Sequence, residues 1–359
     1  MNRKAEQLLQ WYDEHHRHFP WRVTPSERAG GILADPYRVW LSEIMLQQTT
    51  VEAVKPYFQA FVARWPTVSA LAAASDDDVM RAWAGLGYYS RARNLKKCAE
   101  IVANELNGQF PSTIEGLKAL PGIGDYTAAA IAAIAFDRPV AVVDGNVERV
   151  ITRLFAISTP LPAAKPEIRA EVQAITPANR PGDFAQAMMD LGAMICTPRR
   201  PACVLCPVNE DCRVLHDGDP ELYPVKAPKK ERPVRQGAAF VAISPNGAVF
   251  LRKRPASGLL GGMAEVPCTD WTARRDGETS AGGAPFPARW SACGSVGHVF
   301  THFELRLSVY RADNVAEDAA HGGWWASPDE LPDEALPTVM KKAIAAAIPN
   351  AFSRKRHIA

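Results

Sequence analysis

The sequence lacks a long hydrophobic run, an N-terminal signal segment and a strong net charge. Its longest apolar stretch, residues 127–136, is rich in alanine and ends at Asp137, which makes it too short to span a bilayer. The seven cysteines are an odd number and the N-terminus has no secretory character, so we expect a reducing, cytoplasmic compartment. Because the net charge is only +2, any binding of nucleic acid must come from local basic patches.

Length and composition predict two domains. A chain of 359 residues is too long for one ordinary hydrophobic core. In residues 1–222 apolar side chains recur at spacings of three and four, which predicts helices joined by short loops. Residues 223–235 combine three prolines with a cluster of lysines and arginines, a composition typical of a linker. Residues 236–359 form the second expected domain.

In the second domain, apolar residues recur at shorter spacings than in the first. Strands are expected at residues 238–243, 248–251 and 304–310, and a last helix at 336–348. The predicted fold is therefore a mainly α N-terminal domain followed by a smaller α/β domain. Within the first domain, residues 112–115 have the Ser-x-x-Glu form of a capping box and predict a helix start.

Four cysteines stand close together near the middle of the chain. Cys196, Cys203, Cys206 and Cys212 form a C-x6-C-x2-C-x5-C array within seventeen residues. Four thiolates on one short loop can hold a cubane iron–sulfur cluster. Zinc sites usually take two separated C-x-x-C pairs or a mixture of Cys and His, whereas this array has one C-x-x-C and no histidine. The spacing favours a [4Fe–4S] cluster, with zinc as the alternative and disulfides as the least favoured interpretation.

A proline and two glycines separate two helical patterns at residues 120–127. Pro121, Gly122 and Gly124 predict a tight hairpin that opens onto the N-terminus of an alanine-rich helix. The unpaired N–H groups and the dipole at such a helix end favour an anion. A phosphate-binding helix–hairpin–helix is therefore the favoured interpretation, and a plain helix–turn–helix corner is the alternative.

An acidic residue follows the hairpin after a further apolar run. Asp144 precedes Gly145, and such a pair taken alone usually marks a turn. If the hairpin holds DNA, however, a sugar comes close to this carboxylate. A carboxylate there can stabilise the positive charge that develops at C1′ when a glycosidic bond breaks.

The hairpin, Asp144 and the cysteine array, in that order, resemble the endonuclease III superfamily of DNA glycosylases. More specifically, the chain resembles the adenine DNA glycosylases of the MutY type over essentially its whole length. The most specific strings are S-E-I-M-L-Q-Q-T at residues 42–49 and G-L-G-Y-Y-S-R-A at residues 85–92. The hairpin alone is common to the superfamily.

The resemblance assigns roles to particular residues. It implies that Glu43 is the general acid that protonates adenine, from a dry pocket that raises its pKa, while Asp144 stays ionised. Tyr126 and Asn146 are implied to position these two carboxylates. The DNA-binding and base-binding residues implied by the resemblance are Trp21, Arg22, Leu46, Gln48, Leu86, Tyr88, Gly122, Gly124, Gln186, Phe300, Thr301 and His302. Without the resemblance, ordinary helix packing is the simpler interpretation of Trp21, Leu46 and Tyr88.

Tyr126 also separates this chain from bifunctional relatives. Relatives similar to endonuclease III have a lysine at the corresponding position, where it attacks C1′ and forms a Schiff base. A phenol cannot form a Schiff base, so the resemblance implies base excision without efficient strand cleavage.

The C-terminal region resembles the Nudix-like domain of the same family. It has no R-E-x-x-E-E glutamate cluster, so hydrolysis of a nucleotide diphosphate is not expected. Phe300, Thr301 and His302 match the F-S-H loop of the family, which reads 8-oxoguanine opposite adenine. Threonine here replaces the usual serine and keeps its hydroxyl. Ala264 stands where the family commonly has tryptophan, which we interpret as a change in packing.

The sequence therefore predicts a monomeric bacterial enzyme of the nucleoid that acts on double-stranded DNA with an A:8-oxoguanine or A:G pair. One [4Fe–4S] cluster per chain is expected on Cys196, Cys203, Cys206 and Cys212. The alternatives are a glycosylase that excises thymine or damaged pyrimidines, a non-catalytic iron–sulfur DNA sensor, and a Nudix hydrolase.

Overall fold

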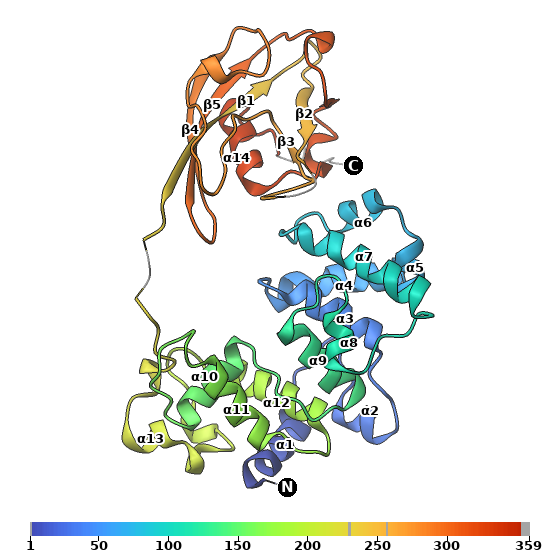
Figure 1. Cartoon of the computed structure of the whole chain (residues 1–359), viewed down its shortest axis with the longest axis vertical. Coiled ribbons are helices and arrows are strands. Elements are labelled where there is room, and N and C mark those ends of the chain that lie inside the picture. The colour runs from blue at the N-terminus through green and yellow to red at the C-terminus, as the bar shows by residue number, and fades with distance from the viewer. Residues whose placement is uncertain (1, 229–230, 256–257, 353–359) are drawn as a thin grey trace, which may run out of the picture. The chain divides into compact units, whose positions relative to one another are not determined.

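The computed structural model of this protein describes residues 2–228, 231–255 and 258–352 (Figure 1). These residues group into two compact units. The helical unit comprises Met1–Ala74 and Arg93–Lys229, and the C-terminal unit comprises Ser75–Ala92 and Lys230–Ala359. The domain bounds expected from the sequence stay a prediction. No helix in the described part of the chain is long and apolar enough to cross a membrane.

The helical unit contains α-helices joined by short loops. They are α1 Arg3–His15, α2 Pro25–Ala29, α3 Pro36–Leu46, α4 Val51–Arg64, α5 Val68–Ala73, α8 Ile114–Lys118, α9 Asp125–Phe136, α10 Gly145–Leu154, α11 Lys165–Ile175, α12 Pro181–Met194 and α13 Arg213–Asp217. Residues 75–92 hold α6 Asp76–Ala82 and the start of α7 Ser90–Glu105. Short 3-10 turns lie at Cys203–Leu205, Asn209–Asp211 and Pro220–Leu222.

The core of this unit is built around α9, which is buried from Thr127 to Ile134. Five of these eight residues are alanine, so other helices can approach α9 closely from several sides. It packs against α3 and α12, and α12 also packs against α1 and α10. One glycine makes a close approach possible, because a Cβ atom on Gly192 of α12 would lie 2.6 Å from the Cβ of Asn146 on α10.

The capping box expected at Ser112 and Glu115 is wrong. Helix α8 begins one residue later, where the hydroxyl of Thr113 accepts a hydrogen bond from the Gly116 amide at 3.2 Å. The Ser112 hydroxyl accepts a hydrogen bond from Arg138 at 3.0 Å instead. Two adjacent hydroxyl residues can each cap a helix, and the distant arginine decides between them.

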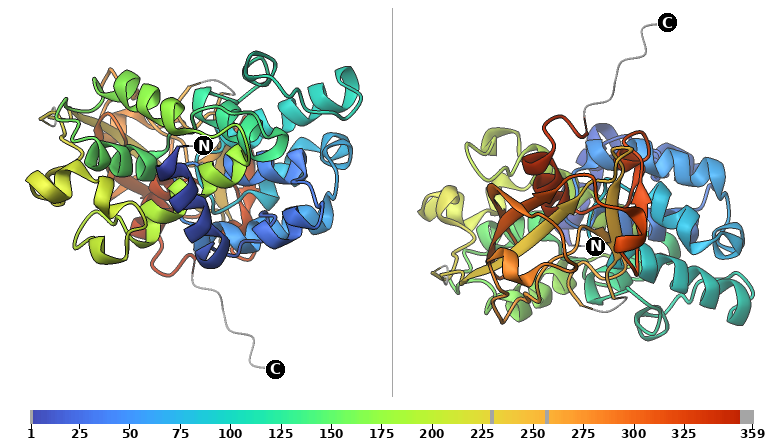
Figure 2. Two further views of the ribbon diagram at one scale, coloured as in Figure 1. Left: turned by 90° about the horizontal axis from the view of Figure 1, so that it is seen from below. Right: turned by 90° about the horizontal axis from the view of Figure 1, so that it is seen from above.

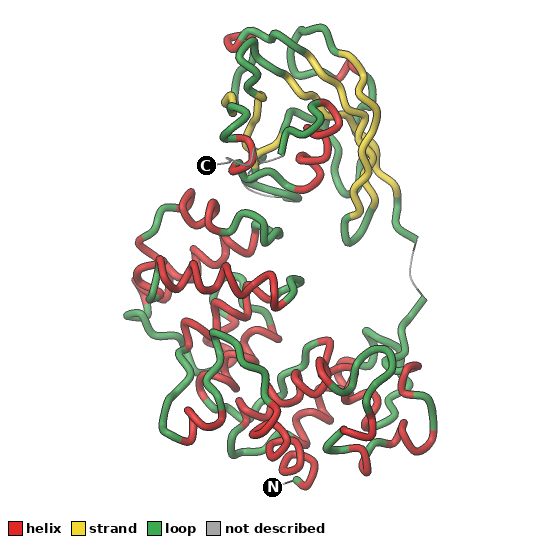
Figure 3. The backbone as a smooth tube through the Cα atoms, turned by 180° about the vertical axis from the view of Figure 1, so that it is seen from behind, coloured by secondary structure: helices red, strands yellow, loops and turns green. Residues whose placement is uncertain are grey.

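Besides α6 and the start of α7, the C-terminal unit contains two three-stranded sheets and one further α-helix in its described residues (yellow strands in Figure 3; yellow to red in Figure 2). The strands are β1 Val234–Ala242, β2 Val249–Lys253, β3 Ala264–Glu265, β4 Ser291–Val299, β5 Glu304–Ala312 and β6 Trp324–Ala326. The sheet orders are β1-β5-β4 and β3-β2-β6. Strand β5 runs parallel to β1 from the pair Val234 and Glu304, and antiparallel to β4. Helix α14, Thr338–Ala347, packs against β1, β4 and β5.

The predicted fold class is confirmed: a mainly α domain is followed by a smaller α/β domain. The three expected strands correspond to β1, β2 and β5, and the expected last helix to α14. Strand β4 was not anticipated. Its sequence, S-A-C-G-S-V-G-H-V, contains two glycines and few β-branched residues, and most of it is exposed, so it has no apolar alternation.

Candidate active site

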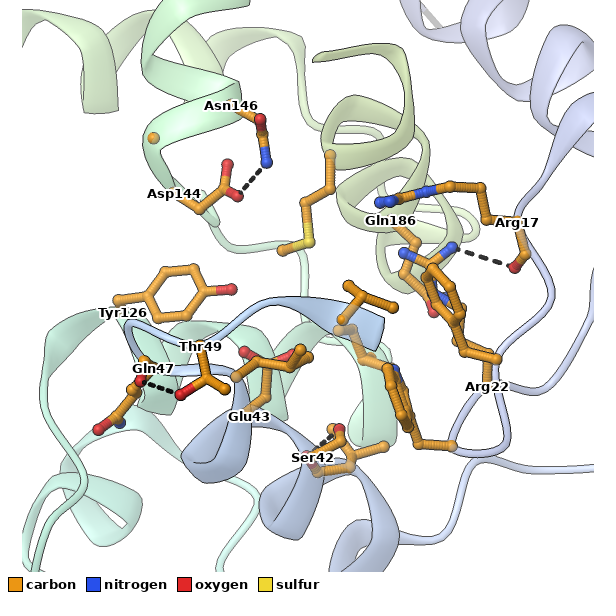
Figure 4. A pocket seen from close by; sticks show the side chains of 18 of the residues that line it. Arg17, Arg22, Ser42, Glu43, Gln47, Thr49, Tyr126, Asp144, Asn146 and Gln186 are labelled. Atoms are coloured by element: carbon orange, nitrogen blue, oxygen red, sulfur yellow. Dashed lines mark hydrogen bonds between the residues drawn. The ribbon is translucent and has the colours of Figure 1, made fainter. Parts of the chain in front are cut away.

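A cavity of about 380 Å³ lies in the helical unit (Figure 4). This volume is in the range of protein pockets that hold small ligands. Of the residues singled out in the sequence, those in its wall are Trp21, Arg22, Glu43, Leu46, Gln48, Tyr126, Asp144, Asn146 and Gln186. Helix α3 contributes Glu43, the first turn of α9 contributes Tyr126, and Asp144 stands immediately before α10. The packing of these helices around the core thus brings two carboxylates and a phenol to one place.

Glu43 is buried in the cavity wall, with 7% of its surface exposed. The pKa of its carboxyl group is raised to about 7, chiefly by burial and further by the charge of Asp144. A hydrogen bond from the Tyr126 hydroxyl and the charge of Arg22 act in the opposite direction. Near neutral pH a large fraction of Glu43 is therefore protonated, and a protonated carboxyl group can act as a general acid.

Tyr126 is a proton donor in this arrangement. Burial raises its pKa well above the ordinary value, and the charges of Glu43 and Asp144 raise it further. Its hydroxyl stays protonated and donates to Glu43. Because it carries no amine, it offers no group for Schiff-base chemistry.

Asp144 is the N-cap residue of α10, and its carboxylate is held by two donors. Its Oδ1 accepts from the Val147 amide at 2.7 Å, and its Oδ2 accepts from Asn146 Nδ2 at 2.9 Å. These charge-assisted bonds and the positive end of the helix dipole stabilise a negative charge at this position. The local fold therefore supplies a fixed carboxylate that faces the cavity, as Figure 4 shows.

Asn146 is in turn oriented by an arginine that reaches the cysteine loop. Arg149 Nη2 donates to Asn146 Oδ1 at 2.9 Å and to the Gly192 carbonyl at 2.6 Å. Its Nε donates to the Cys196 carbonyl at 2.7 Å. The acceptor side of the Asn146 amide is thus occupied by Arg149, which turns the NH₂ group toward Asp144.

The rest of the wall mixes aromatic, aliphatic and amide groups. The ring of Trp21 stacks on Phe19 with centroids 5.1 Å apart and meets the edge of Phe58 at 5.3 Å. Gln186 is buried on α12. Gln48 has a left-handed backbone with φ of 56°, a strained conformation that often marks functional positions when the residue is not glycine.

The hairpin before α9 has the expected form. Gly122 has φ of 79°, and a Cβ atom there would lie 2.8 Å from the Cβ of Asn94, so only glycine fits this turn without a shift. Gly124 is the N-cap of α9 and provides no side-chain cap. The first amides of a twelve-residue helix are therefore left without a capping side chain, which suits an anion such as a phosphate.

The remaining sequence-predicted residues lie outside the cavity wall. In the C-terminal unit, Leu86 is buried, whereas Tyr88 is 55% exposed and has φ of 48°. Phe300 opens the loop between β4 and β5, where its ring stacks on Phe303 with centroids 4.8 Å apart. The next two residues, Thr301 and His302, are exposed at the tip of this hairpin.

The four cysteines of the array surround a second, smaller cavity. It is also lined by apolar side chains such as Val150, Leu154 and Leu191. All four thiols are free, and Arg153 Nη1 donates to the sulfur of Cys196 at 3.2 Å. Among the described residues no three Cys, His, Asp or Glu side chains converge on a single ion position. Four thiols placed around a shared apolar cavity fit an iron–sulfur cluster, which ties the loop together when bound.

Two residues of this region were missed by the sequence analysis. Arg17 lines the cavity, and Asp190 lies behind its wall, where it pairs with Arg17 and Arg22. The available signal was an aspartate inside the otherwise apolar stretch of α12, because a buried carboxylate needs a partner. The sequence did not indicate which cations pair with it.

Three family models match parts of the chain. Residues 41–177 match the model of the HhH-GPD superfamily base excision DNA repair protein. Residues 196–212 match the iron-sulfur binding domain of endonuclease III, and residues 238–346 match a NUDIX domain.

Individual relatives are similar over most of the chain. The chain is 35% identical to an adenine DNA glycosylase of Homo sapiens, over 93% of this chain and 72% of that protein. It is 37% identical to an adenine DNA glycosylase of Mus musculus, over 93% of this chain and 76% of that protein. Among solved structures it is similar to a thermostable thymine-DNA glycosylase, with 30% identity and a TM-score of 0.53, over 60% of this chain and 96% of that one.

Proposed function

This chain belongs to the adenine DNA glycosylases of the HhH-GPD superfamily, and from this premise we propose that it removes adenine paired with 8-oxoguanine or guanine without cutting the DNA strand. As a member of that family it is a hydrolase of N-glycosidic bonds in base excision repair, and it carries one [4Fe–4S] cluster. The observation that carries the proposal is the cavity in which a carboxyl group of raised pKa lies near a second, hydrogen-bonded carboxylate.

The proposed reaction assigns one role to each carboxylate. Protonated Glu43 gives its proton to a ring nitrogen of adenine, so that the bond from the base to C1′ breaks and its electron pair leaves with neutral adenine. The carboxylate of Asp144 stabilises the positive charge that develops at C1′. A water molecule then adds to C1′ and gives its proton to Glu43, which leaves an abasic sugar in an intact strand.

The absence of strand cleavage is proposed from the composition of the cavity wall. A lyase needs an amine that attacks C1′. No lysine belongs to the wall as far as the structure describes it, and Tyr126 stands directly after the hairpin. We propose a monomer as the acting form.

Reading of the opposite base is assigned to the loop at residues 300–302. Phe300 is held by ring contacts with Phe303 and by His298, whose ring meets it edge-on at 4.6 Å. This anchoring leaves the exposed side chains of Thr301 and His302 to contact a base.

An assay on defined duplexes tests the proposed activity. Full-length protein is incubated with duplexes that hold a single A:8-oxoguanine, A:G, A:T or T:G pair, and the strands are separated with and without alkali. We expect strand breaks only after alkali, and only with the first two duplexes. Equal breakage without alkali would show lyase activity, and breakage of the thymine strand in T:G would show a different base specificity.

Replacement of His302 tests how the opposite base is read. His302→Ala is expected to lower the ratio of excision rates on A:8-oxoguanine and A:G by about fivefold to 150-fold, because one good base contact is worth about 1–3 kcal/mol. His321→Ala, which alters another exposed histidine of the same unit, is the control and should keep the ratio. An unchanged ratio in His302→Ala would show that His302 takes no part in the recognition of 8-oxoguanine.

A further inference from the structure

A fully buried carboxylate lies directly behind the wall of the cavity. Asp190 on α12 has 0% of its surface exposed, and its two oxygens accept four hydrogen bonds. Arg17 donates from its amide at 2.9 Å and from Nε at 2.7 Å, and Arg22 donates from Nη1 at 2.7 Å and from Nη2 at 3.0 Å. Every strong acceptor position of the carboxylate is thereby used.

The two arginines that Asp190 binds are both part of the cavity wall, as Figure 4 shows. Their guanidinium carbons lie 4.9 Å and 4.8 Å from the ring centroid of Phe19, so the aromatic ring holds them on a second side. Arg22 also donates to the Arg17 carbonyl at 3.4 Å. These contacts join Arg17, Arg22, Phe19 and Asp190 into one cluster, in which each residue contacts at least two of the others.

We propose that Asp190 is a positioning residue for adenine excision, which holds Arg17 and Arg22 as a preformed wall of hydrogen-bond donors for the adenine. An arginine side chain has many rotamers, and fixing them before substrate arrives removes an ordering step from binding and reaction. Asp190 does not line the cavity and acts only through the two arginines.

The ion pair between Asp190 and Arg22 also affects the pKa of Glu43. The charged or titratable groups that act on Glu43 are Tyr126, Asp144 and Arg22, and the charge of Arg22 lowers its pKa. Arg17 and Arg22 pair with Asp190, and the Tyr12 hydroxyl is also close to it. Burial alone would raise the pKa of Asp190, yet the two arginines keep it below its ordinary value, so it stays charged and offsets Arg22.

These charges determine in which direction the pKa of Glu43 moves when the charge of Asp190 is removed. Removing the charge of Asp190 leaves the positive charge of Arg22 uncompensated, which lowers the pKa of Glu43. A smaller fraction of Glu43 is then protonated at neutral pH. Because excision needs the protonated form, the pH at which the rate begins to fall should move to lower values.

The test compares two buried aspartates of the same helix. Asp190→Asn is measured beside Asp183→Asn, whose carboxylate is equally buried on α12 but pairs with Arg180 and Arg28 away from the cavity. Single-turnover excision of adenine from an A:G duplex is followed from pH 5.5 to pH 9, together with duplex binding and thermal unfolding. Wild-type protein in the same assay shows whether adenine excision itself takes place.

For Asp190→Asn we expect excision at pH 7 to fall about tenfold to a hundredfold and the alkaline fall of the rate to begin at lower pH. Asp183→Asn should lose comparable thermal stability, with an excision rate within about threefold of wild type and an unchanged pH profile. A folded Asp190→Asn protein with the rate and profile of the control would overturn the proposal.

A second variant covers the case in which Asp190→Asn does not fold. Arg22→Met/Asp190→Leu removes one buried ion pair and leaves only Arg17, whose side chain is 27% exposed, without its carboxylate partner. Arg17 is then the only arginine through which the loss of Asp190 can act, so this protein should excise adenine at a rate less than tenfold below that of Arg22→Met alone. A rate more than tenfold below that of Arg22→Met would mean that Asp190 has a role beyond the two arginines and would contradict the inference.

Discussion

Asp144→Asn is expected to lower single-turnover excision of adenine by about 10²–10³-fold while duplex binding stays close to that of the wild type. The exchange removes a negative charge and puts an NH₂ group in place of Oδ2, which accepts from Asn146. Asparagine is as good an N-cap as aspartate, so it can still accept from the Val147 amide and preserve the start of α10. The expected loss therefore reports the charge of this carboxylate together with its hydrogen bond to Asn146.

A matched control separates this effect from helix capping. Asp35 is the N-cap of α3, where it accepts from the Tyr37 amide at 2.9 Å, and it lies outside the cavity wall. Asp35→Asn should keep excision within about twofold of wild type. If Asp144→Asn excises adenine as fast as Asp35→Asn, the charge at residue 144 has no part in the reaction.

The hairpin and the turn at Asp144 could be predicted from the sequence because they stand at helix starts with a local signature, whereas the role of Tyr126 came from the family resemblance. Gly122 and Gly124 mark the hairpin, and Tyr126 follows them in the first turn of α9. Asp144 precedes Gly145 at the next helix start. Cap and turn chemistry depends on neighbours in the chain, so it can be read without knowing the tertiary structure.

Contacts between distant segments could not be predicted from the sequence in this way. Arg17 and Asp190 are separated by 173 positions, and the sequence around either residue does not indicate that the two pair. The helix start at Thr113 was misplaced because the side chain that occupies Ser112 comes from Arg138, 26 positions away. Strand β4 is held by pairing with β5 and by the packing of α14, whereas its own residues have weak strand propensity. In each case tertiary structure decides among options that are locally equivalent.

The raised pKa of Glu43 was expected only from the family resemblance, and the structure provides its physical cause. In the sequence it is a glutamate on an amphipathic helix, which is usually exposed and ionised. Burial by the helices around α9 is the main cause of the shift, and the nearby charge of Asp144 adds to it. The pair thus consists of one carboxyl group that binds a proton near neutral pH and one that accepts two hydrogen bonds.

Glu43→Gln is accordingly expected to lower excision by about 10²–10⁴-fold, the usual range for loss of a general acid. Glutamine has the shape of the protonated acid and no charge, so the fold and the binding of duplex should be retained. Glu52→Gln on α4 is the control, because Glu52 is an exposed glutamate that pairs only with Lys55 in the described contacts and does not line the cavity. It should keep wild-type excision.

The pH profile gives the sharper test of the same prediction. With a pKa of about 7, Glu43 loses its proton as the pH rises, so wild-type excision should fall about tenfold per pH unit well above neutrality. Glutamine does not titrate, so the small remaining rate of Glu43→Gln should not fall over that range. A variant that keeps the alkaline fall of the wild type would place the titrating acid elsewhere, with Glu43 reduced to a part of the cavity wall.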